Sequence, residues 1–128
     1  MADEIKITLA LVYQNGQLKH QYNPGQLKLP QATAGVEQQT WAVGTSEEDI
    51  SLSGNLTATG FTILQSLEAT TTGNFVTYGA KSSTGGIGNP LGKLGPKQIH
   101  MFTLNSTSTL RAKADTAGVN VAVTIFDA

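Results

Sequence analysis

The chain has 128 residues, a length that suits one domain with a hydrophobic core of its own. It contains no cysteine, which excludes disulfides, thiol catalysis and thiolate metal sites. Only 13% of its residues are charged and the formal net charge is −1, so the chain lacks the excess of Lys and Arg with which proteins bind nucleic acid or anionic lipid. We therefore expect neither nucleic acid nor a membrane as a partner.

The N-terminal part predicts short strands separated by turns. In "EIKITLALVY" apolar residues alternate with polar ones, which is the pattern of a strand with one apolar face. Asn15-Gly16 marks a turn that begins a hairpin, and Asn23-Pro24-Gly25 divides the next segment into two extended pieces. The opening residues have no positive leader, so we expect no secretory signal.

The middle of the chain continues the pattern. A strand is predicted for residues 36–44, which include Trp41, and Ser46 stands where it can cap a single helical turn through Asp49. Residues 60–69 are apolar on parts of both faces, which favours a central strand. We expect residues 74–80 to pair with that strand across the turn "TTTGN".

The C-terminal residues give the clearest prediction. Residues 108–114 lead through "DTAG" into "VNVAVTIFD", which predicts a final hairpin. Its last strand has one continuous apolar face, formed by Val119, Val121, Val123 and Ile125. No window of useful length shows helical periodicity.

These elements predict an all-β fold, a single antiparallel β-sandwich that spans residues 1–128. Turn signals recur at the spacing that is typical of such sandwiches. Jelly-roll connections are favoured. An up-and-down barrel and an immunoglobulin-like sandwich remain alternatives, although the absence of paired cysteines weakens the latter.

The stretch "SSTGGIGNPLGKLGPK", residues 82–97, raises the question of a phosphate-binding loop. In a Walker-type loop two glycines lie five positions apart and Lys is followed by Ser or Thr, whereas Gly88 and Gly92 lie four apart and Lys93 precedes Leu94. A dinucleotide-binding loop opens a helix, which Pro90 and Pro96 oppose. We interpret the stretch as a long, conformable connection between two strands.

The residue types that commonly act in catalysis or bind metals do not form a recognisable motif in this sequence. His20 and His100 have no second ligand at metal-binding spacing, and Glu47-Glu48-Asp49 are adjacent where a calcium loop needs alternating oxygen ligands, so they predict a solvated turn. No G-x-S-x-G elbow activates a serine. We therefore expect no enzyme, no metal and no cofactor. The aromatic residues are interpreted as core, with a sugar-stacking platform as the alternative.

Four stretches of the sequence carry a resemblance to a known group of proteins. They are "AVGTSEEDISL", "FTILQSLEATTTGNFVTYG", "LGPKQIHMFTL" and "TLRAKADTAGVNVAVTIFD". Together they cover most of the chain after Ala42, and their pattern resembles the small virion proteins of tailed phages that act as capsid cement or head-decoration proteins.

The resemblance implies a structural protein that binds the outside of a phage capsid shell, contacts the major capsid protein, forms a homotrimer and is assembled into virions in the host cytoplasm. Candidate contacts to the capsid or a neighbouring copy lie in the glycine-rich stretch: Gly85, Gly86, Gly88, Asn89, Lys93 and Lys97. The alternative function is a receptor- or carbohydrate-binding β-sandwich module of a virion tail.

Overall fold

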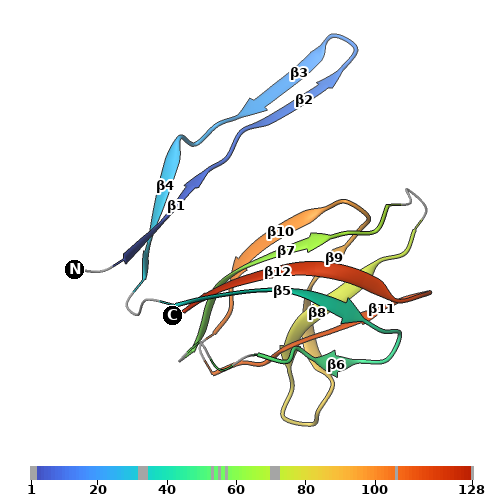
Figure 1. The fold of residues 1–128 in the computed structure, drawn as a ribbon. Helices are drawn as coiled ribbons and strands as arrows, with labels where there is room; N and C mark the ends of the chain where they lie inside the picture. The colour runs from blue at the N-terminus through green and yellow to red at the C-terminus, as the bar shows by residue number, and fades with distance from the viewer. Residues whose placement is uncertain are drawn as a thin grey trace. The chain divides into compact units, whose positions relative to one another are not determined.

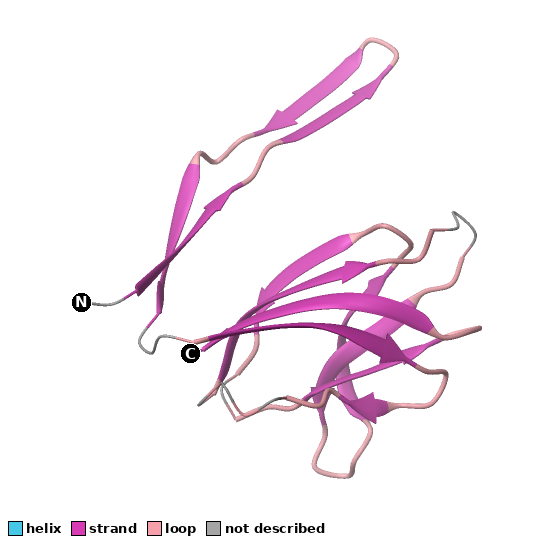
Figure 2. Cartoon of the chain, viewed as in Figure 1, coloured by secondary structure: helices cyan, strands magenta, loops and turns pink. Residues whose placement is uncertain are grey.

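The computed structural model describes residues 3–31, 35–52, 54, 56, 58–69, 73–105 and 107–127. These residues form strands, turns and loops and no helix, which confirms the predicted all-β class (Figure 2). Among them no helix could therefore cross a membrane. The chain divides into two compact units, Met1–Thr33 and Ala34–Ala128 (Figure 1).

The first unit is a ribbon of two antiparallel chain segments. At its base β1 (Asp3–Thr8) pairs with β4 (Gln26–Gln31), and beyond them β2 (Leu11–Asn15) pairs with β3 (Leu18–Tyr22). Gly16 has a φ of 59° in the turn between β2 and β3, so the predicted Asn15-Gly16 hairpin is confirmed.

An irregularity separates the two halves of the ribbon. Leu9 and Ala10 on one segment face residues 23–25 on the other, which is one residue more. The side chain of Asn23 accepts a hydrogen bond from the backbone N–H of Gly25 at 3.1 Å, and Gly25 has a φ of 78°. This local turn confirms the predicted break between two extended pieces.

The second unit is a β-sandwich of two antiparallel four-stranded sheets (Figure 1). In order across the first sheet lie β10 (Ile99–Thr103), β7 (Thr59–Ser66), β12 (Val119–Asp127) and β5 (Val36–Val43). In order across the second sheet lie β6 (Glu48–Asp49), β11 (Leu110–Ala114), β8 (Val76–Lys81) and β9 (Ile87–Leu94). The central position of β7 agrees with its predicted place. Jelly-roll topology and a single domain over residues 1–128 stay predictions.

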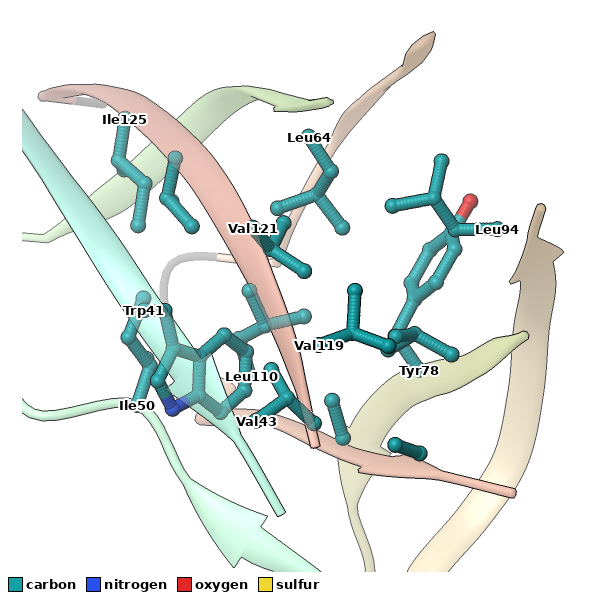
Figure 3. Close-up of a cluster of buried hydrophobic side chains, with 14 of the residues drawn as sticks. Trp41, Val43, Ile50, Leu64, Tyr78, Leu94, Leu110, Val119, Val121 and Ile125 are labelled. Carbon is teal, nitrogen blue, oxygen red and sulfur yellow. The ribbon is translucent and has the colours of Figure 1, made fainter. Parts of the chain in front are cut away.

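The core lies between the two sheets of the sandwich (Figure 3). The predicted inward face of β12 is confirmed, because Val119, Val121, Val123 and Ile125 are each at most 3% exposed. Leu64 enters the same cluster from β7, and the second sheet contributes the side chains of Tyr78, Leu94 and Leu110. Period-two alternation turns these residues inward and leaves their neighbours on the outer faces.

Two predicted strand pairings are wrong. The strand β8 pairs with β9 and β11 in the second sheet and not with β7. Similarly, β11 and β12 belong to different sheets, so residues 115–118 cross between the sheets and do not form a hairpin turn. Alternation identifies the face that a strand turns to the core, but a core between two sheets accepts an apolar face from either side.

The predicted helical turn at residues 46–49 is also wrong. Glu48 and Asp49 form the short edge strand β6, opposite Ala112 and Arg111 of β11. The carboxylate of Glu48 accepts a hydrogen bond from the backbone N–H of Gly44 at 3.0 Å. The acidic side chains are therefore satisfied by partners outside a helix.

Candidate functional site

The glycine-rich stretch is not the long connection that the sequence predicts. Residues 82–86 form a tight turn, in which the backbone N–H of Ser82 donates to the carbonyl of Gly86 at 2.7 Å. Residues 87–94 are the edge strand β9, and a second turn follows it. The stretch is thus a β-hairpin arm with β8 and a turn, which corrects the interpretation of a conformable loop.

Close approaches of neighbouring groups explain several of its glycines. A Cβ atom placed on Gly92 would lie 2.5 Å from the phenol oxygen of Tyr78, and one on Gly88 would lie 3.1 Å from the Cβ of Ser82. Across the hairpin, a Cβ on Gly79 would lie 2.7 Å from the carbonyl oxygen of Asn89. These glycines make room for cross-strand packing and do not supply flexibility.

The six predicted contact residues fall into two groups. Gly85 and Gly86 lie in the turn, and Gly88 and Asn89 begin β9. Lys93 and Lys97 lie toward and beyond the other end of the strand. Gly86 and Lys93 lie seven positions apart, which is about 23 Å at about 3.3 Å per residue along a strand. A single small contact does not include both groups, and their role as contacts stays a prediction.

The acidic run predicted as a solvated turn takes part in an ion-pair cluster between β6, β8 and β11. The carboxylate of Asp49 lies 2.8 Å from Nζ of Lys81 and 2.6 Å from Nη1 of Arg111. Hydrogen bonds from Lys81, and then from Arg111, hold the pKa of Asp49 below its ordinary value. Glu47 lies 3.5 Å from Nε of Arg111 and accepts a hydrogen bond from the N–H of Ile87 at 3.3 Å. The cluster joins the edge of the sheet to the hairpin turn.

The two histidines lie in separate settings. His100 on β10 shares a 2.6 Å hydrogen bond with the phenol of Tyr78, and His20 lies on β3, opposite Tyr13. The described part of the chain holds no group of three or more His, Cys, Asp or Glu residues placed to bind a metal ion. Burial raises the pKa of Tyr78. This arrangement is that of a packed inter-sheet contact.

The ribbon carries the largest feature that the sequence interpretation missed. Cross-strand partners lie on the same face, so Ile5 and Ile7 share one face of the β1–β4 pair with Leu29 and Leu27. In the β2–β3 pair one face carries Leu11, Tyr13, Leu18, His20 and Tyr22. Four of these, Leu11, Tyr13, Leu18 and Tyr22, are between 48% and 63% exposed. The ribbon therefore has an apolar face, hereafter the ribbon face, that its own unit does not cover.

The register of the ribbon keeps the apolar residues of its two halves on the same face. They occupy even positions in β3 and odd positions in β4, as Tyr22 and Leu27 illustrate. The extra residue in the turn at 23–25 offsets this change of parity, which would otherwise place the two sets on opposite faces. The alternation and the Asn-Pro-Gly break were both visible in the sequence. The sequence did not show that the described strands of the ribbon form only two-stranded pairs, with no third strand of their own unit to cover this face.

The first sheet of the sandwich has an outer face with similar chemistry. We call it the outer sheet face, and its large apolar residues are Val36, Phe61, Ile63, Ile99, Met101 and Phe126. The remaining outward positions of its strands are Ala, Thr, Gln and Asn, with no charged residue. Ile99 is 54% and Val36 is 50% exposed, and the rings of Phe61 and Phe126 lie 6.1 Å apart. This face has the composition of a protein-binding surface.

Comparison with known proteins gives little further information. No protein-family model matches the chain, and no curated protein matches it. Among solved structures it is similar to a protein of Bacillus endospore appendages, which are described as a novel family of disulfide-linked pili. The identity is 13% and the TM-score is 0.34. The match covers 75% of this chain and 92% of that chain. At this score the likeness supports no argument about fold or function.

Proposed function

We propose that the chain is a structural protein that adds in repeated copies to a protein shell, as a capsid cement or decoration protein of a tailed phage, and that the N-terminal ribbon is its main contact element. The observation that carries the proposal is the ribbon face. Four of its side chains, Leu11, Tyr13, Leu18 and Tyr22, are about half exposed or more.

A two-stranded ribbon of this kind needs a protein surface to cover it. An isolated two-stranded hairpin is only marginally stable in water, because it buries little apolar area against the entropy of ordering its residues. The β1–β4 and β2–β3 pairs are each two-stranded sheets with no third strand. Contact with another molecule would supply the missing burial, which is the role of an arm in an assembly.

The remaining surface suits many weak contacts. The chain carries 8 Lys or Arg and 9 Asp or Glu in 128 residues, so most of its polar surface is Thr, Ser, Gln and Asn. Uncharged polar groups lose less on desolvation than charges do. Contacts repeated over a shell gain strength through multivalency, so each copy needs no deep binding site.

The proposal is tested by binding of the purified chain to undecorated shells from the particle that carries it. The variant Ile7→Glu/Leu27→Glu places two carboxylates on the ribbon face at one cross-strand pair. Its control, Thr8→Glu/Gln26→Glu, places the same charges on the opposite face at the adjacent pair. We expect the parent and the control to co-sediment with shells and the first variant to lose binding at least tenfold. Absence of shell binding by the parent would overturn the proposal.

A second candidate is the binding of carbohydrate, because two aromatic rings are exposed on the same ribbon face. Tyr13 is 48% and Tyr22 is 51% exposed, and Asn15 and His20 share their face. Exposed rings beside amide groups can stack on sugars. Saturation-transfer NMR with host-surface saccharides tests this candidate: transfer that Tyr13→Ala and Tyr22→Ala both abolish would favour it over shell binding, and transfer to neither parent nor variants would dismiss it.

A further inference from the structure

We propose that the ribbon face of one copy covers the outer sheet face of a second copy of this chain. The inference rests on the proposed role of the ribbon as a contact element, and it names the partner. Each copy gives one ribbon and receives one, so the contact closes as a reciprocal pair or as a ring such as the expected homotrimer.

The two surfaces match in chemistry. The ribbon face of β2–β3 carries no carboxylate and no Lys or Arg, and two neighbouring cross-strand pairs of β1–β4 on that face, Ile5–Leu29 and Ile7–Leu27, are aliphatic. The outer sheet face likewise carries no charged residue in its strands. The lysines of the ribbon, Lys6, Lys19 and Lys28, lie on its opposite face. Contact of the β2–β3 face and of the pairs Ile5–Leu29 and Ile7–Leu27 with the outer sheet face therefore buries no unpaired charge.

The two surfaces also match in size. The ribbon is two strands wide, about 10 Å, and the nine residues of β12 make the sheet about 30 Å long, so one contact has a footprint of about 300 Å² on each side. Both sides of one contact together bury about 600 Å², so a reciprocal pair, whose single interface holds two such contacts, buries about 1,200 Å². This value reaches the lower end of the range for specific interfaces, about 1,200–2,000 Å².

Cysteine cross-linking tests the contact directly, because the chain has no cysteine of its own. Two full-length variants are mixed. One carries Ile7→Cys on the ribbon face, and the other carries Met101→Cys on the outer sheet face and is labelled with ¹⁵N. A bis-maleimide reagent that spans about one sheet-to-sheet distance, about 10 Å, then links neighbouring thiols. We expect a mixed product of two chains, identified by mass spectrometry.

Matched controls place the cysteine on surfaces that lie outside the proposed contact. Thr8→Cys lies on the opposite face of the ribbon, and Lys113→Cys lies on the exposed side of β11 in the second sheet. We expect at least tenfold less mixed product from either control. Adding Ile63→Glu to the Met101→Cys chain should remove the product, since it places a charge in the outer sheet face.

Several outcomes would overturn the inference. A chain that carries both Ile7→Cys and Met101→Cys and cross-links only within itself at every concentration would show that the ribbon lies on its own sheet. Mixed products that are equally abundant with the controls would show random collision. Light scattering that gives 13.4 kDa at all concentrations would also contradict the contact.

The same variants separate this inference from the proposed function. If Ile7→Glu/Leu27→Glu loses shell binding and the cysteine variants give no cross-link between copies, the shell remains the partner of the ribbon. The proposed contact with a second copy is then wrong. Cross-linking between copies without shell binding by the parent would establish self-association and dismiss the cement function.

Discussion

The phenol oxygen of Tyr78 lies 2.6 Å from Nδ1 of His100, and this hydrogen bond joins β8 of the second sheet to β10 of the first. The ring of Tyr78 also stacks on Phe102 of β10, with centroids 5.3 Å apart. His100 therefore belongs to a contact that holds the two sheets of the sandwich together.

Replacing Tyr78 with Phe should lower the free energy of unfolding by about 1 kcal/mol, the usual net value of a hydrogen bond. Burial raises the pKa of Tyr78 above its ordinary value of 10.0, so the stability that depends on the neutral phenol is fully present below pH 10 and is lost as the pH rises through the pKa of the folded state. Urea unfolding between pH 7 and 11 measures both effects. A variant whose stability falls as steeply as that of the parent above pH 10 would contradict them.

Gly92→Ala should destabilise the protein by about 1–3 kcal/mol, because the added methyl group meets the Tyr78 ring and forces it to move. Gly44→Ala is the matched control, since a Cβ at Gly44 has no atom within 4 Å. Thermal unfolding of both variants checks the difference. Equal midpoints would show that the ring has free space to shift.

Val121→Asp should prevent folding or leave a largely unfolded chain. Val121 is 1% exposed between the sheets, and burying an unpaired carboxylate costs several kcal/mol, on the order of the stability of a small domain. Asn120→Asp, at the exposed neighbouring position of the same strand, is the control and should melt close to the parent. Circular dichroism reports both. A Val121→Asp variant that melts with the control would show the strand register to be wrong.

Lys93→Glu with Lys97→Glu tests the contact residues predicted from the sequence. Nζ of Lys93 lies 4.6 Å from the centroid of the Phe75 ring, so the double change should lower stability by no more than about 1 kcal/mol. If the two lysines meet acidic groups on a shell, binding of the variant should weaken, and binding of the parent should weaken with salt. Lys113→Glu, on β11, is the control. Full binding by the double variant would leave these lysines as solvated residues.

The local alternation of apolar and polar residues, together with the turn residues, was enough to predict most strands. The alternation in β12 and the Asn15-Gly16 turn each depend on residues adjacent in sequence, so the sequence could identify them. The sheet to which β8 or β11 belongs depends on partners that are distant in the chain, and alternation does not distinguish two sheets that share one core.

The candidate sites could not be predicted fully from the sequence for the same reason, as a glycine of β9 and the ribbon show. Gly92 is small because Tyr78, its cross-strand partner on β8, lies over it, and this pairing depends on a register that the sequence pattern did not predict. Ile7 and Leu27 alternate as core residues do, although their unit leaves them without a covering layer. A pattern identifies a face that needs burial, and only the assembled fold identifies what buries it.

The most direct test is amide hydrogen exchange of residues 3–31 in the free chain at high dilution and in the particle of which we propose that it is a part. We expect rapid exchange in the dilute chain, where the ribbon is uncovered, and at least a hundredfold slower exchange in the particle, where another molecule covers it. Slow exchange already in the dilute chain would show that the ribbon is covered by its own chain. Rapid exchange in the particle would contradict its role as a contact element.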